Sequence, residues 1–213
     1  MNRRDLLYLV LKGFLAWLLL SALLGVCGEW LIRALFPFIK AVMISMMPEL
    51  SPGLKLLKSP QSVFDFSIEL SALVLRPIYL NAGQYIQPGA NLKSTADMLH
   101  VLVPLVIEWS ILLAWPVRNW MQRLWLLALG LPMAILVVLG TLPAQLLGNL
   151  EISFQDIALT GSNPRQAPWF VDWMIFCEMG GRWLLGIAAA WLCIQLRKAF
   201  IRDIKPVSVQ FPL

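Results

Sequence analysis

The sequence predicts an all-α membrane protein: a four-helix transmembrane bundle with a small extracytoplasmic β element. Hydrophobic residues make up 59% of the 213 residues and charged residues only 14%, whereas a soluble domain is about half apolar and about a quarter charged. Four apolar segments are each long enough to cross a hydrocarbon core of about 30 Å. Between the first two, residues 64–71 alternate apolar and polar side chains with the period of a β-strand.

The first apolar segment, residues 6–27, predicts an N-terminal transmembrane anchor. Only Lys12 interrupts it, and a lysine side chain is long enough to place its charge at the nearer interface. Arg3 and Arg4 precede the segment as they would in a signal peptide. Residues 21–25 are a poor cleavage site, so we expect the segment to be retained.

Residues 28–47 predict an amphipathic continuation of this first helix. Glu29 and Arg33 lie one helical turn apart, in the order that favours an ion pair. Pro37 predicts a kink. We therefore take residues 1–47 as one unit, an N-terminal anchor with an amphipathic extension.

Residues 48–95 predict an extracytoplasmic segment that contains β structure. The alternation begins at residue 64, and its apolar end continues to residue 75, where Arg-Pro breaks it. Residues 78–80 predict a second short strand, and Pro-Gly at 88–89 predicts a turn. We expect a small hairpin or sheet built from residues around 62–80.

Residues 96–147 predict the second and third membrane spans, at 96–115 and 124–147. The third span contains Pro132 and Pro143, which a transmembrane helix tolerates where neighbouring helices satisfy the freed backbone groups.

The last two units are an extracytoplasmic loop, residues 148–168, and a final helix with a cytoplasmic tail, residues 169–213. Residues 150–155 alternate again and predict a strand that joins the earlier hairpin. The fourth span is expected over residues 169–194.

Basic residues predict the orientation of the chain. Eight lie in short segments on one side of the predicted spans, and five are spread over two longer loops on the other side. The denser side is expected to be cytoplasmic, so both termini are predicted inside. Because these charges flank apolar segments, the net charge of +5 does not predict a nucleic-acid partner. The eight are Arg3, Arg4, Arg118, Arg123, Arg197, Lys198, Arg202 and Lys205; the five are Lys55, Lys58, Arg76, Lys93 and Arg165.

Three charged residues deep in apolar segments mark the candidate site: Glu108, Glu178 and Arg182. A charge at membrane depth costs at least about 2.5 kcal/mol, so it faces a partner, a cavity or another charge. Glu178 and Arg182 lie one helical turn apart with Gly181 between them, and we expect them to meet Glu108 at one level. Such a group is either an internally satisfied ion pair or a polar pocket near the outer leaflet that receives a substrate or a partner, and we expect it to dock a helix. Gly186 adds a small residue that lets another helix approach closely.

A catalytic interpretation uses Cys177, Arg182 and His100, since a thiol with a histidine and an arginine forms a workable nucleophilic set. Exosortases, which are intramembrane transpeptidases, use a cysteine, an arginine and a histidine. Here the histidine precedes the cysteine, the reverse of that order, and the local motifs are missing. The three cysteines have no metal-ligand spacing, so we expect neither a metal nor another cofactor.

The layout of the chain resembles that of the small membrane proteins encoded beside exosortases, the exosortase-associated membrane proteins. The points of resemblance are the anchor at 6–27, the alternation at 64–75, and an expected turn at 91–93 that leads into the second span. The resemblance implies a non-catalytic partner in bacterial envelope protein sorting or export, located in the inner membrane.

We therefore expect an accessory or scaffold subunit of an inner-membrane complex, in contact with other membrane subunits and with the lipid bilayer. Its outer loops are expected to contact the partner. Two alternatives stay open, an intramembrane cysteine transpeptidase or protease of exosortase type and a transporter or channel subunit.

Overall fold

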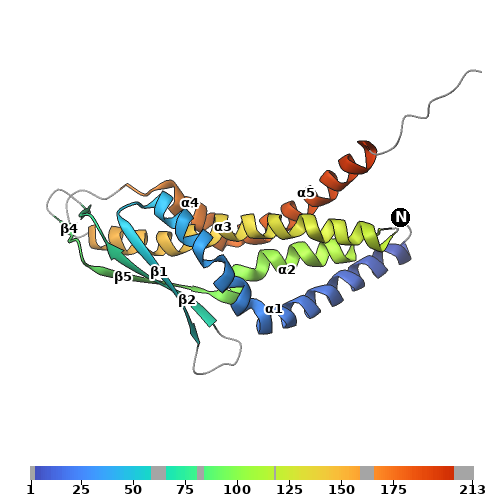
Figure 1. Cartoon of the computed structure of the whole chain (residues 1–213), viewed down its shortest axis with the longest axis horizontal. Helices are drawn as coiled ribbons and strands as arrows, with labels where there is room; N and C mark the ends of the chain where they lie inside the picture. The colour runs from blue at the N-terminus through green and yellow to red at the C-terminus, as the bar shows by residue number, and fades with distance from the viewer. Residues whose placement is uncertain (1–2, 59–65, 81–83, 118, 159–165, 204–213) are drawn as a thin grey trace, which may run out of the picture.

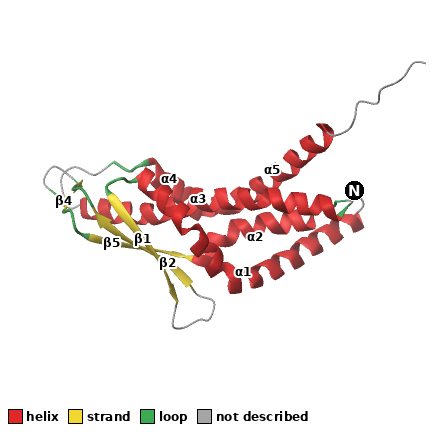
Figure 2. Ribbon diagram, viewed as in Figure 1, coloured by secondary structure: helices red, strands yellow, loops and turns green. Residues whose placement is uncertain are grey.

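The protein is mostly helical, with a three-stranded sheet and a two-stranded sheet that lie at one end of the bundle, beside the end of α3 and the second half of α1 (Figures 1 and 2). The computed structural model describes residues 3–58, 66–80, 84–117, 119–158 and 166–203. The elements are, in order, α1 (Arg3–Met46), β1 (Leu50–Lys58), β2 (Phe66–Val74), β3 (Ile78–Tyr79), β4 (Tyr85–Ile86), β5 (Asn91–Asp97), α2 (Met98–Ala114), α3 (Trp120–Ala158), α4 (Trp169–Phe176), the π-helical turn η1 (Cys177–Gly181) and α5 (Arg182–Asp203).

Three helices are long and apolar enough to cross a membrane: Leu7–Met46, Trp120–Ala158 and Trp169–Ala199. This finding indicates a membrane protein. The last of them is the bent helix formed by α4, η1 and α5, so the described chain has four helices in total. The fourth, α2, is also apolar but has only 17 residues, which span about 25 Å at 1.5 Å per residue.

The helix α2 lies at the centre of the bundle, where it contacts α1, α3 and α5. Gly186 of α5 makes one of these contacts possible, because a Cβ atom there would lie 2.7 Å from the backbone oxygen of Pro104 in α2. No real Cβ atom sits that close to a backbone oxygen. The expectation that Gly186 admits a neighbouring helix is thus confirmed.

The two halves of α1 have different surroundings. In the first half, large apolar side chains such as Leu7, Phe14 and Leu19 are exposed. In the second half, Ile32, Ile39 and Met43 are buried one or two turns apart, the spacing of an amphipathic helix. The expected extension is confirmed, and Pro37 lies inside α1 without ending it. Figure 1 shows that α1 bends and that its second half lies beside the sheet.

The main sheet is antiparallel, with strand order β1-β2-β5. Its inner face is apolar: Ile68, Leu70 and Ala72 are fully buried. Its outer face is polar and includes an ion pair between Lys93 and Glu69, whose Nζ and Oε1 atoms lie 3.6 Å apart. This division is typical of an antiparallel sheet with one face in water.

The alternation over residues 66–74 is confirmed as strand β2, and the short strand at 78–79 pairs with β4. The start of the expected element, residues 62–65, lies outside the described residues. The turn expected at 91–93 is wrong, because these residues belong to β5, which pairs with β2. Strand β1 was not expected because Pro52 and Gly53 weaken its pattern; both are tolerated in a strand at the edge of a sheet.

The strand expected at residues 150–155 is also wrong, and so is the loop expected to begin at residue 148. Helix α3 continues to Ala158. Leu147, Leu150, Phe154 and Ala158 are all buried, at the three- and four-residue spacing of a helix. Over only six residues, apolar side chains at this helical spacing resemble the apolar–polar alternation of a β-strand.

The N-terminus, the α2–α3 connection and the C-terminal end of α5 lie at the same end of the bundle, opposite the sheet (Figure 1). Basic side chains hold this end together. Arg123 of α3 donates hydrogen bonds to the backbone oxygens of Leu113 and Trp115 at the end of α2. Arg197 of α5 donates to Gln122 Oε1 at 2.7 Å. Arg118, Arg165 and Lys205 lie outside the described residues.

The close approach of α2 and α5 can be tested with Gly186→Ala. We expect a loss of about 1–3 kcal/mol of stability, because the added methyl group would overlap backbone atoms of Pro104 that cannot move aside by a side-chain rotation. The matched control is Gly140→Ala in α3, where a Cβ atom would meet nothing within 4 Å and where alanine favours the helix. Thermal unfolding in mild detergent measures both; equal melting temperatures for the two variants would contradict this packing.

Candidate functional site

A backbone kink positions the candidate site. The last span does not run straight, because Gly180 has φ 106° and ψ 0°, a left-handed conformation that glycine adopts without strain. The adjacent Gly181 lets the backbone pass close to Phe176, since a Cβ atom at residue 181 would lie 2.6 Å from the backbone oxygen of Phe176. The kink separates α4 from α5 and places Glu178 just before the bend and Arg182 just after it.

The Glu178 carboxylate joins residues from three other places in the bundle. Its Oε1 atom accepts hydrogen bonds from Arg182 Nη2 at 2.8 Å and from Gln145 Nε2 of α3 at 2.8 Å. Its Oε2 atom lies 3.3 Å from Nε2 of His100 in α2. The expected Glu178–Arg182 pair is therefore present, and it is the centre of a polar cluster that we define as His100, Gln145, Glu178 and Arg182.

The members of the polar cluster differ in exposure. Arg182 is 1% exposed, whereas the side chains of Glu178 and His100 are 42% and 41% exposed. Two donors of the buried guanidinium, Nε and Nη1, have no hydrogen-bond partner within the described part of the chain. A buried cation with incomplete hydrogen bonding depends strongly on its counter-ion. Glu178 is thus the group that offsets the free-energy cost of burying the Arg182 charge.

The polar cluster lies where the sheet meets the bundle. Strand β5 ends at Asp97, and α2 begins at the next residue. The Asp97 side chain caps α2 by accepting a hydrogen bond from the Leu99 backbone nitrogen at 3.1 Å. His100 follows within the first turn. The cluster therefore belongs to the sheet end of the bundle rather than to its middle.

Glu108 is not part of the polar cluster, which corrects the expectation that the three charges meet at one level. It is fully buried, and its Oε1 atom accepts a hydrogen bond from Cys193 Sγ of α5 at 3.8 Å. Cys193 lies eleven residues beyond Arg182, about 16 Å along the helix. The expectation assumed that Glu178 and Arg182 lie as deep as Glu108. Instead, Glu178 lies beside His100 in the first turn of α2, and Glu108 follows His100 by eight residues, about 12 Å along that helix.

The residues of the catalytic interpretation are partly brought together. His100 and Arg182 both contact Glu178, so the acidic residue stands between them. Cys177 lies next to Glu178 in the chain and is 1% exposed, which leaves no open approach to its thiol. Among the described residues there is no group of three or more His, Cys, Asp or Glu side chains that could hold a metal ion.

The sequence analysis missed Gln145, the member of the polar cluster that belongs to α3. A signal for it exists, because Gln145 is a polar side chain inside an apolar span and lies near the end of that span. A polar residue in such a position usually hydrogen-bonds across helices.

The dependence of Arg182 on Glu178 can be tested with Glu178→Ala. We expect a loss of about 3 kcal/mol, the lower end of the range for breaking a buried ion pair, because Glu178 itself is partly exposed. The control is Glu29→Ala, which removes a similarly spaced pair with Arg33 at 2.6 Å on an exposed part of α1. That change should cost no more than about 1 kcal/mol.

Thermal unfolding in detergent, followed by near-ultraviolet circular dichroism, measures both losses. The double variant Glu178→Ala/Arg182→Met should recover part of the stability, since it removes the unpaired charge as well. Equal losses for Glu178→Ala and Glu29→Ala would show that Arg182 does not need its counter-ion.

Comparison with known proteins gives no match: no protein-family model, no curated protein and no solved structure is similar to this chain. The resemblance in layout to exosortase-associated membrane proteins therefore stays a prediction.

Proposed function

We propose that this chain is a non-catalytic scaffold or accessory subunit of a bacterial inner-membrane complex, one that serves envelope protein sorting or export. Four helices cross the membrane in this proposal, with α2 as the shortest span. The sheet is held outside the cytoplasm at a fixed height above the bilayer, where a partner protein contacts it.

This proposal rests on the observation that the sheet is attached to the bundle at several places. Strand β5 passes into α2 without an intervening residue. Helix α3 extends beyond the bundle and packs against β5, where Asn149 Nδ2 donates a hydrogen bond to the Thr95 backbone oxygen at 3.3 Å. Helix α1 contacts β1. A sheet held by three helices cannot swing as a tethered domain would, and fixed presentation is what a scaffold requires.

The sheet belongs in water on physical grounds. An open sheet has unpaired backbone groups at its edges, and the hydrocarbon core has no water to satisfy them. Its outer face also carries Lys55, Glu69 and Lys93. Since the opposite end of the bundle carries the denser set of basic residues, the positive-inside rule supports an extracytoplasmic sheet.

Burial argues against the two alternative functions. A transpeptidase needs a nucleophile that its substrate can reach, and Cys177 is 1% exposed. A transporter needs polar side chains along a path, and Glu108 is enclosed, with Cys193 as its hydrogen-bond partner. The polar cluster and the Glu108–Cys193 hydrogen bond instead connect helices of the bundle to one another.

The orientation can be tested with fusions to alkaline phosphatase, which is active only outside the cytoplasm. A fusion after Gly89 should be active, because it follows the first span. A fusion after Asn119 should be inactive, because it follows α2. Activity in the Asn119 fusion would overturn both the orientation and the assignment of α2 as a membrane span.

The scaffold role can be tested by inserting four Gly/Ser residues between Asp97 and Met98, which loosens the sheet from the bundle. We expect the full-length protein to copurify with a partner in mild detergent, and the insertion to reduce that recovery at least tenfold while membrane insertion persists. The control is the same insertion after Arg76, in an exposed connection between β2 and β3. A wild-type chain recovered alone would count against the proposal.

The catalytic alternative has its own test in the same preparation. Cys177→Ala should leave partner recovery and any activity of the complex unchanged, because a scaffold does not use the thiol. Loss of activity with intact assembly would instead support a cysteine enzyme.

A further inference from the structure

A row of exposed apolar side chains runs along one side of α1, from its first half into its second. Its members follow one another at intervals of three or four residues, the spacing of one face of a helix. We call this row the outer stripe. It consists of Leu19, Leu23, Val26, Trp30, Ala34, Pro37, Ala41 and Ile44, all of them exposed.

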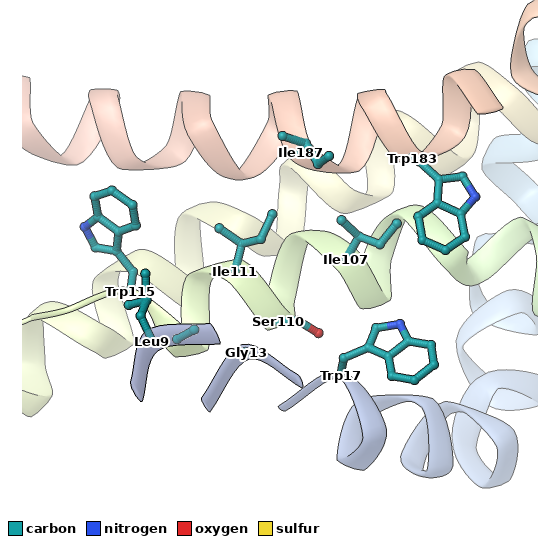
Figure 3. Close-up of a pocket in the computed structure, with 10 residues that line it drawn as sticks. Leu9, Gly13, Trp17, Ile107, Ser110, Ile111, Trp115, Trp183 and Ile187 are labelled. Carbon is teal, nitrogen blue, oxygen red and sulfur yellow. The ribbon is translucent and has the colours of Figure 1, made fainter. Parts of the chain in front are cut away.

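The outer stripe is not the side of α1 that faces the bundle. In the first half of α1, Gly13 and Trp17 line a groove together with residues of α2 and α5 (Figure 3). A Cβ atom at Gly13 would lie 3.6 Å from the Cβ atom of Ala114 in α2. In the second half, Ile32 and Ile39 are buried. The outer stripe therefore lies on a side of the helix that the described part of the chain leaves open.

Helix α1 is longer than one crossing of a bilayer requires. Its 44 residues extend about 66 Å, more than twice a hydrocarbon core of about 30 Å. Residues 7–28 alone extend about 33 Å. Yet Trp30 and Ile44, which lie beyond that crossing, are 78% and 49% exposed. Because the removal of large apolar side chains from water is favourable, an apolar environment is favoured for both halves of the outer stripe.

The charged residues of the second half lie together on one flank of the helix. Arg33 follows Glu29 by one helical turn, and the two side chains pair at 2.6 Å. Lys40 follows Arg33 by seven residues, which is about two turns. Residues 13–28 contain no charged residue, so the charges begin where the crossing ends. An apolar stripe beside a charged flank is typical of a helix that lies in the membrane interface, with its apolar side in the acyl region and its charges among the headgroups.

The bend in α1 permits this placement, because the second half does not continue in the direction of the first (Figure 1). We infer that residues 29–46 form an interfacial helix in the leaflet nearer to the sheet, with the outer stripe against acyl chains and Glu29, Arg33 and Lys40 at the headgroups. The bilayer is favoured over a protein partner because the outer stripe continues without a break from the part of α1 that is apolar enough to cross the membrane.

The position of this helix also sets the position of the sheet. Helix α1 contacts β1, so an interfacial second half keeps the sheet close to the membrane surface. This inference does not depend on the scaffold function.

Spin labels that report depth in a bilayer test this inference. The full-length protein, with its three native cysteines replaced by serine, carries one labelled cysteine at a time in vesicles of phosphatidylethanolamine and phosphatidylglycerol. Depth is measured by comparing the collisions of the label with oxygen, which concentrates in the bilayer, with its collisions with a water-soluble nickel chelate.

We expect the labels of Trp30→Cys and Ile44→Cys to lie at similar depths, within about 10 Å of the boundary between headgroups and acyl chains, and the label of Leu19→Cys to lie deeper. The control is Leu73→Cys on the outer face of the sheet, 45% exposed, whose label should meet the chelate freely. Ile44 lies fourteen residues beyond Trp30, about 21 Å along the helix. A second half that stands upright on the bilayer would therefore give Ile44 the accessibility of Leu73 and overturn the inference.

If the cysteine-free chain does not fold, hydroxyl-radical footprinting of the unmodified protein in the same vesicles makes the same distinction. After correction for intrinsic reactivity, Trp30 and Phe38 should be oxidised at least about fivefold more slowly than Tyr79, because little water reaches the acyl region; Tyr79 is 69% exposed in β3. Equal rates would overturn the inference. Protection that appears only with a copurified protein would show that a protein covers the outer stripe, and it would overturn the inference as well.

Discussion

One carboxylate links three helices next to the place where the sheet joins the bundle. Glu178 accepts hydrogen bonds from Arg182 and Gln145 and lies within 3.3 Å of His100, so α2, α3 and α5 meet at a single side chain. Arg182 is buried against it with two donors unpaired. In a region of low dielectric constant such a cation is tolerated only with its counter-ion in place. The two groups lie four residues apart, with the kink at Gly180 between them.

Much of the fold follows from local patterns in the sequence. Long apolar runs predict the helices, and the alternation in β2 predicts a strand, because each signal is contained within the element itself. The two strands that the sequence did not predict are formed through pairing with β2. Strand β1 contains Pro52 and Gly53, and β5 is mostly polar, yet both pair with β2. For residues 150–155 the error has another source, since helical packing of Leu150 and Phe154 resembles alternation over a short window.

The site was predictable at the level of residues and not at the level of geometry. Charges within apolar runs single out Glu178 and Arg182, and their spacing predicts their ion pair. The placement of Glu108 depends on how α2 and the last helix are aligned along the bundle, which is a property of the folded chain. Glu178 follows the start of the last helix, Trp169, by nine residues, yet it lies beside His100 in the first turn of α2.

The polar residues of the bundle divide into groups with different physical roles. At the sheet end, the polar cluster connects α2, α3 and α5, and Asp97 caps α2 directly after strand β5. At the opposite end, Arg123 and Arg197 tie α3 to the ends of α2 and α5. Between them the helices meet through apolar contacts, through the Glu108–Cys193 hydrogen bond and through a hydrogen bond that Trp173 Nε1 donates to the Gly140 backbone oxygen at 2.8 Å. Because both ends are tied by polar contacts, the helices are held at fixed positions relative to one another, as the proposed scaffold role requires.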